Sequence, residues 1–234
     1  MIICAKYLMT GDGETVLEGQ AVLTGGDGKI KKIAPKEELV QDFPEEEVKD
    51  YGEATLLPGL CDMHVHLAYW YSQPDSFNYN EQMITLYALQ HAQAAFERGI
   101  TSVRDMSSYH GVCRSLKLAQ EKGFITIPRI THTDTGMCMT GGHACDEVPE
   151  VDGPWEVRKE IRKQVRDGAE WVKILTTHRS HIPELTQEEL NAAVDECHRR
   201  GIKCGVHAGT NPGIQMCIDA GFDTIEHATF MTLD

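Results

Sequence analysis

The chain has 234 residues, of which 41% are hydrophobic and 25% charged, so it is long enough to bury a substantial core. Its 36 acidic residues outnumber its 22 basic residues, and the resulting formal net charge of -14 argues against nucleic acid and anionic membranes as partners. No apolar stretch is long enough to cross a bilayer and no signal peptide is recognisable, so we expect a cytoplasmic protein.

Residues 1–57 are Gly-rich and strand-like, with the segments AKYLMT, TVLEGQAVLT, KIKKIAP and ATLLPG separated by turn signals. This pattern predicts a small β-domain. The acidic stretch 35–50 is interpreted as a solvated turn or short helix without a function of its own. The domain boundary is predicted between residues 57 and 58.

After Pro58 the pattern changes to helices that stop at a glycine and are followed by a strand. Five such junctions predict a parallel sheet with right-handed crossovers, and a strand within residues 56–67 precedes them. The predicted strands after the stop glycines are ITSVRD (100–105), FITIPRI (124–130), AEWVKIL (169–175), IKCGVHA (202–208) and FDTIEHA (222–228).

His64 and His66 lie two residues apart in the first of these strands, so both side chains are predicted to point to one face. Lys173, His207 and His227 follow their stop glycines by five or six residues and therefore reach the ends of their strands together. In a closed α/β barrel this level is the rim that carries active sites, whereas in an open sheet it is the edge crevice. Singly, each residue could be an ordinary rim histidine or a snorkelling lysine.

The eight cysteines are scattered without a Cys-x-x-Cys pair, and we predict mostly buried thiols in place of a disulfide or zinc scaffold.

Taken in order, the segments LLPGLCDMHVHL, GITSVRD, TGGHACD, GAEWVKILTT, TQEEL, VHAGT and TIEHATF resemble the amidohydrolase superfamily, in particular its imidazolonepropionase-like and cytosolic dipeptidase (prolidase-like) branches. The resemblance implies a (β/α)8 TIM-type barrel joined to a small N-terminal β-domain, which is part of a composite β-sandwich. It also implies two divalent metal ions, expected to be Zn²⁺. His64 and His66 would hold one ion, His207 and His227 the other, and a carboxylated Lys173 would bridge both.

Two metal ions can activate a water for attack on an amide, so the implied reaction is hydrolysis of a dipeptide, an N-acyl amino acid or a cyclic amide. In the loop 133–147, His143 resembles a histidine that lies near the substrate in this branch, although an incidental rim histidine is equally compatible. Arg104 could support the site by ion pairing or form a structural salt bridge. His178 and His181 are left outside the metal set.

The predicted barrel reaches only about six strands before Asp234, which follows His227 too closely to belong to an eighth strand. We therefore expect a fragment that lacks the catalytic aspartate of its relatives and is inactive alone. Two alternatives stay open: a mononuclear deaminase of the same superfamily, and a non-catalytic partial barrel that only binds metal. The sequence also leaves open a homo-oligomer and the identity of the small-molecule substrate.

Overall fold

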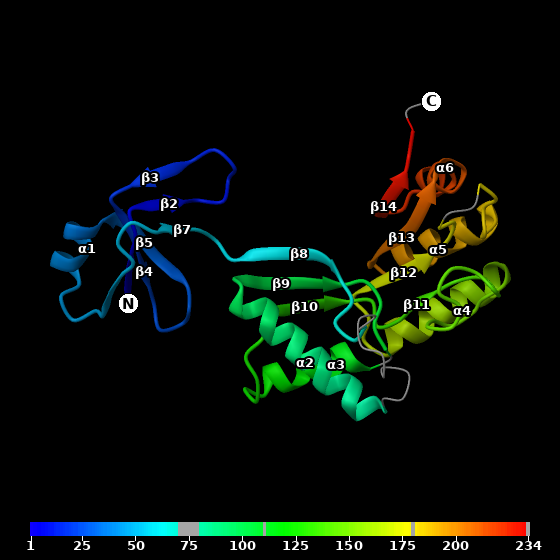
Figure 1. The fold of residues 1–234 in the computed structure, drawn as a ribbon, viewed down its shortest axis with the longest axis horizontal. Coiled ribbons are helices and arrows are strands. Elements are labelled where there is room, and N and C mark those ends of the chain that lie inside the picture. The colour runs from blue at the N-terminus through cyan, green and yellow to red at the C-terminus, as the bar shows by residue number, and fades with distance from the viewer. Residues whose placement is uncertain (70–79, 110, 179–180, 233–234) are drawn as a thin grey trace. The chain divides into compact units, whose positions relative to one another are not determined.

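A computed structural model of the chain describes residues 1–69, 80–109, 111–178 and 181–232 (Figure 1). Trp70 and Asp234, to which we assign no role, lie outside the described residues. The chain divides into two compact units, Met1–Gly59 and Leu60–Asp234. None of the helices in the described part is both long and apolar enough to span a membrane.

The first unit contains two small sheets and one short helix. The four-stranded sheet has the order β5-β4-β1-β6 and the three-stranded sheet the order β3-β2-β7. Its helix α1 (Lys36–Asp42) lies within the acidic stretch and buries Leu39 in the core of the unit. The strands are β1 (Ile2–Cys4), β2 (Tyr7–Met9), β3 (Val16–Glu18), β4 (Gln20–Thr24), β5 (Ile30–Pro35), β6 (Val48–Asp50) and β7 (Thr55–Leu56).

The second unit begins with a three-stranded parallel sheet of order β10-β9-β8. Figure 1 shows two helices, α2 and α3, along one face of this sheet. Alanine and aliphatic side chains of these helices pack against β9 and β10 as one apolar core. The elements are β8 (Leu60–Val65), α2 (Glu81–Glu97), β9 (Ile100–Asp105), α3 (Val112–Glu121) and β10 (Arg129–His132).

A four-stranded parallel sheet of order β11-β12-β13-β14 follows, and α4, α5 and α6 accompany it. A second apolar core, with Val172, Ile174 and Val206 at its centre, joins these strands to the helices. Helix α5 begins with the predicted capping box of Thr186 and Glu189. The elements are β11 (Gly136–Met137), α4 (Gly153–Arg166), β12 (Trp171–Leu175), α5 (Gln187–Arg199), β13 (Lys203–Thr210), α6 (Asn211–Ala220) and β14 (Thr224–Phe230).

The predicted α/β class with parallel strands is confirmed, and one strand prediction is wrong in position. The segment 124–130 was expected as a strand, but β10 begins only at Arg129. Pro128 lacks the N–H that a central strand must donate, and Phe124 is 79% exposed. Closure of the strands into a barrel, and of the first unit into a sandwich, stays a prediction.

Candidate metal centre

His64 and His66 face each other at the end of β8. Their Nε2 atoms are 3.3 Å apart, with His64 inside the strand and His66 one position beyond its end. The Nδ1 atom of His66 lies 2.7 Å from the carbonyl oxygen of Ser107, and the Nδ1 atom of His64 lies 2.6 Å from Oε2 of Glu226. A carbonyl oxygen only accepts hydrogen bonds, so Nδ1 of His66 donates and its Nε2 carries the lone pair.

The Glu226 carboxylate imposes the same arrangement on His64. Desolvation works to raise the pKa of Glu226, but hydrogen bonds from His64 and Thr224 and the charge of Arg104 lower it to about 2. An ionised carboxylate only accepts, so Nδ1 of His64 donates to it and Nε2 of His64 is a second lone pair. Carboxylates and backbone carbonyls that orient histidines in this way are typical partners of metal ligands.

When both rings are neutral, two lone pairs face each other at 3.3 Å, and a cation between them relieves the repulsion. A tetrahedral zinc ion with bonds of 2.0–2.1 Å would place two imidazole nitrogens roughly 3.3 Å apart. The donor pair therefore fits a zinc ion in both chemistry and spacing.

The other predicted ligands lie close to His64 and His66. A cavity of about 360 Å³ is lined by His66, Lys173, His207, His227 and His143, among others. The ring of His227 lies 4.7 Å from that of His64 and 4.6 Å from that of His207, measured between centroids. The structure thus gathers every residue of the predicted metal set, although their role as ligands stays a prediction.

Lys173 is the largest fully buried side chain among the described residues, with 1% of its surface exposed. Burial lowers its pKa to about 8, with smaller contributions from nearby charges. Among the described residues, none forms a hydrogen bond or an ion pair with its Nζ atom. A buried ammonium without such a partner is costly, so the neutral, reactive amine of Lys173 is more populated than that of an exposed lysine.

Three histidines of the cavity have lowered pKa values and are therefore also held neutral. Desolvation, together with the neighbouring imidazoles and Lys173, lowers the pKa of His66 to about 4 and that of His207 to about 2. The pKa of His227 is lowered for the same reasons. Neutral imidazole is the form that binds metal, so the electrostatics of the cavity agree with a cation site.

Glu226 and His227 are neighbours in β14, yet both contact His64. A regular strand would send the two side chains to opposite faces. Here His227 and Ala228 have positive φ values of 73° and 46°, and this local reversal brings both side chains to the same histidine. The strain at these two positions is typical of a functional site.

Glu226 is the functional residue that the sequence prediction missed. It also accepts from Arg104, whose Nη2 lies 2.8 Å from Oε1, and from Thr224, whose Oγ1 lies 2.6 Å from the same oxygen. Arg104 is 5% exposed and packs on the ring of Trp171, at 4.5 Å from its centroid. Both earlier interpretations of Arg104 therefore apply, since its ion pair is buried and also orients a histidine of the site.

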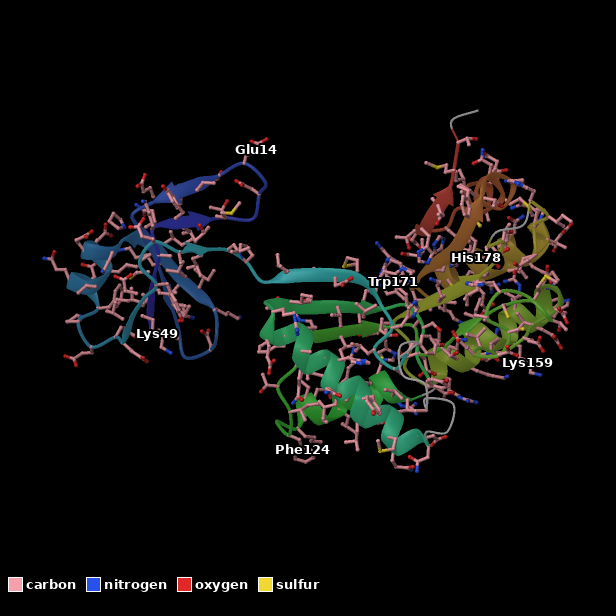
Figure 2. The ribbon with its side chains drawn as sticks, viewed as in Figure 1. Glu14, Lys49, Phe124, Lys159, Trp171 and His178 are labelled. Atoms are coloured by element: carbon pink, nitrogen blue, oxygen red, sulfur yellow. The ribbon has the colours of Figure 1, made fainter. Side chains whose placement is uncertain are left out.

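His178, which the prediction left outside the metal set, also belongs to this group of side chains. It follows β12 by three positions, and Figure 2 labels it together with Trp171 at the start of that strand. Its Nδ1 atom lies 2.9 Å from Nε2 of His207, and its ring stacks on that of His143 with centroids 4.3 Å apart. These three rings could hold a cation themselves, since their donor atoms lie within 4.8 Å of one another.

Gly209 explains how the loop of His178 approaches β13. A Cβ atom at position 209 would meet the carbonyl oxygen of His178 at 2.0 Å, which real structures do not show. The backbone N–H of Gly209 also donates to the Thr177 carbonyl oxygen at 2.7 Å. The glycine in the segment VHAGT is therefore the residue that lets the loop of His178 lie against β13.

Comparison with known proteins adds the following. Residues 55–233 match the family model described as Amidohydrolase family. Ochratoxinase of Aspergillus niger is 26% identical to the chain over 268 residues, which cover 98% of this chain and 54% of that enzyme. The chain thus spans about half the length of the curated relatives it matches.

Among solved structures, a Xaa-Pro dipeptidase with methionine bound in its active site is 30% identical, with a TM-score of 0.83 over 99% of this chain and 62% of that chain. A prolidase in complex with N-methylphosphonate-L-proline is 24% identical, with a TM-score of 0.86 over 99% of this chain and 61% of that chain. At this identity the second likeness shows the fold alone.

Proposed function

Because the chain belongs to the amidohydrolase family, as its motifs predicted, we propose that it forms the metal centre of a hydrolase that cleaves an amide (C–N) bond. The proposed substrates are small molecules: a dipeptide, an N-acyl amino acid or a cyclic amide. When bound, two divalent ions would lower the pKa of a water and polarise the substrate carbonyl. The names of the dipeptidase and the ochratoxinase support this class of substrate.

One observation carries the proposal: the Nε2 lone pairs of His64 and His66 converge at 3.3 Å while both Nδ1 atoms are engaged by acceptors. Neither histidine can rotate its ring without losing a hydrogen bond to Glu226 or to the Ser107 carbonyl. The pair is therefore preorganised for one cation, and His207 and His227 offer a second pair of imidazoles beside it.

Lys173 would supply the ligand shared by both ions. Its neutral amine can attack carbon dioxide, and the product is a carbamate anion on Nζ with release of one proton. The carbamate replaces a buried cation with two oxygen donors that suit Zn²⁺. The buried position of Lys173 in the wall of the cavity supports this assignment.

The cavity itself sets the size of the substrate. Its volume of about 360 Å³ lies in the range of small-molecule pockets and matches a dipeptide or an N-acyl amino acid. His143 lines the cavity, and its backbone N–H is held by Glu184 at 2.9 Å, so the side chain is presented from a fixed loop. We assign His143 to substrate binding.

Metal analysis tests the proposal. His64→Ala or His66→Ala should each lower the bound zinc by one equivalent relative to the unsubstituted protein, because each removes one of two converging donors. Lys173→Ala should also remove one equivalent, whereas unchanged zinc in that variant would favour the mononuclear deaminase. His181→Ala is the matched control, since this exposed histidine lies in the loop after Lys173 and outside the metal set. Unchanged zinc in both His64 and His66 variants, with the fold retained, would refute the metal centre.

A further inference from the structure

A second group of metal-binding side chains lies away from the histidine cavity. His198 is in the last turn of α5, Cys204 is the second residue of β13, and Asp223 directly precedes β14. One ligand atom from each lies within 4.8 Å of the other two. Cys204 precedes His207 by three residues, which is about 10 Å along a strand, so this group lies at the opposite ends of the strands from the cavity.

We propose that His198, Cys204 and Asp223 form a second zinc site, which links the end of α5 to the starts of β13 and β14 (Figure 1). The three donors are a thiolate, an imidazole and a carboxylate, a combination that suits zinc. This site was not expected from the sequence, where Cys204 is one of eight scattered cysteines predicted to be simply buried.

Two of the three distances between the donors are close to the edges of a tetrahedron around zinc. His198 Nε2 lies 3.0 Å from Asp223 Oδ2, and Cys204 Sγ lies 3.8 Å from the same oxygen. Zinc with ordinary bond lengths would place these pairs roughly 3.4 Å and 3.6 Å apart. Shifts of a few tenths of an ångström therefore suffice to admit the ion.

Two of the donors are already fixed relative to each other. The backbone N–H of Cys204 donates to Asp223 Oδ2 at 2.9 Å, and the backbone N–H of Asp223 donates to the carbonyl oxygen of Cys204 at 3.1 Å. These two reciprocal hydrogen bonds hold the Asp223 carboxylate against the start of β13 before any ion binds. Because these groups are already ordered, the entropic cost of binding the metal ion is low.

The alternative is an ordinary surface ion pair between His198 and Asp223, whose side chains are 46% and 22% exposed. Such a pair contributes little to stability. It does not involve the third member: the Sγ atom of the fully buried Cys204 donates a long hydrogen bond of 3.8 Å to the same carboxylate oxygen, so all three side chains meet at one atom.

Charge and protons balance in the assembled site. Zinc binding releases the thiol proton of Cys204, and a neutral His198 keeps its proton on Nδ1 while Nε2 binds the ion. The thiolate and the carboxylate then carry two negative charges, which neutralise a divalent cation. The exposed side of His198 leaves the fourth position to a water molecule. Cys197 lies beside Cys204 but is outside the set, since it does not join the group within 4.8 Å.

Cobalt(II) is the probe, because a thiolate bound to it gives a near-ultraviolet charge-transfer band that imidazole and carboxylate ligands do not give. Among the described residues that line the histidine cavity, none is a cysteine, so the band reports this second site alone. Metal-free protein titrated with cobalt should develop the band to saturation at about one equivalent. His64→Ala should leave the band unchanged, which separates this site from the proposed active centre.

Cys204→Ser should abolish the band, and His198→Ala should weaken cobalt binding at this site at least about tenfold. His198 is half exposed, so its variant keeps the fold even where the Cys204 variant does not. Cys217→Ser is the matched control, because it places a serine in the same apolar core outside the group. Absence of the band in the unsubstituted protein, or an unchanged cobalt affinity in His198→Ala, would overturn the proposal.

Discussion

Glu226 on β14 accepts a hydrogen bond from Nδ1 of His64 on β8 at 2.6 Å, across 162 positions of the sequence. The same carboxylate also accepts hydrogen bonds from Arg104 and Thr224, so three separate hydrogen bonds hold it in place. A histidine that binds metal is commonly oriented by such a carboxylate, which also raises its basicity. Glu226 therefore links β14 to the histidine pair at the end of β8 and orients the ring of His64.

Glu226→Gln should lower zinc affinity by about 10- to 100-fold, because an amide keeps one acceptor but loses the charge that orients His64 and pairs with Arg104. Competition with a chelating dye measures the change. Glu170→Gln is the matched control, since Glu170 makes an exposed ion pair with Lys117 away from the cavity. Equal zinc affinity in the Glu226 and Glu170 variants would show that the Glu226 contact is only structural.

A buried carboxylate supports the second histidine in the same way. Asp105 is fully buried and accepts from the backbone N–H of Leu67 at 2.8 Å, from Ser108 Oγ at 2.7 Å and from the Ser107 N–H at 3.3 Å. Ser107 has a φ of 128°, and its carbonyl oxygen accepts a hydrogen bond from Nδ1 of His66. Asp105 thus fixes the backbone on both sides of the His66 contact.

Asp105→Asn should destabilise the protein by about 1–3 kcal/mol, because the NH2 group of the asparagine would face N–H or O–H donors where a carboxylate oxygen now accepts hydrogen bonds. It should also weaken zinc binding, since the strained Ser107 carbonyl would no longer be held toward His66. Urea denaturation and zinc titration measure the two effects. Ser108→Ala removes one donor only and should show a smaller version of both. Lost stability with unchanged zinc affinity would contradict the positioning role.

The fold class and the gathering of the histidines could be predicted because both depend on local signals. Stop glycines such as Gly168 and Gly201 mark where each strand starts, so the register of Lys173 and His207 follows by counting. The role of Glu226 could not be predicted, because strand alternation places it opposite His227. Only the left-handed backbone at residues 227–228 removes that conflict, and nothing in TIEHATF indicates it.

The approach of His178 to His207 depends on a tertiary contact that periodicity does not record. It requires the close backbone packing of Gly209 against the loop after β12, which a sequence pattern does not distinguish from an ordinary turn. The late start of β10 follows from Pro128, a signal that was present and was outweighed by the β-branched residues around it. Features that depend on neighbouring residues could thus be predicted from the sequence, whereas contacts between distant segments could not.

The lowered pKa values of His66 and His207 predict that the metal-free protein loses stability as the pH falls. Unfolded histidines titrate near 6.5, whereas burial and neighbouring charges lower the folded pKa of His66 to about 4. Between these values the unfolded chain binds more protons, so stability declines from pH 6.5 toward 4 and is unaffected by His66 above 6.5. The contribution of His66 is about 1–3 kcal/mol.

Urea denaturation of metal-free protein at several pH values between 7.5 and 4.5 measures this slope. His66→Gln should flatten it, because the glutamine side chain does not titrate. His181→Gln, at an exposed position in the loop beyond Lys173, should leave the slope unchanged. A slope that is identical in all three proteins would contradict the burial of a neutral His66.

Lys173 allows a test that separates a ligand from a structural residue. If its carbamate bridges two ions, Lys173→Ala in the full-length protein should lower hydrolysis of a panel of dipeptides and N-acyl amino acids at least about a hundredfold, as expected for loss of a metal ligand. A short carboxylic acid such as acetate or propionate should restore part of the activity, because its carboxylate can occupy the space that the shortened side chain leaves. Lys117→Ala, which removes a lysine from a surface ion pair, is the matched control.

Lys173→Arg should stay inactive with or without the acid, because a guanidinium keeps the positive charge but cannot be carboxylated and offers no oxygen donor. A second readout does not depend on turnover: protein prepared in ¹³C-bicarbonate should show a carbamate carbon resonance that disappears in Lys173→Ala. Burial and the pKa of about 8 favour the neutral amine that this reaction needs. An active Lys173→Arg variant would show that the buried lysine serves the packing of β12 and not the metal centre.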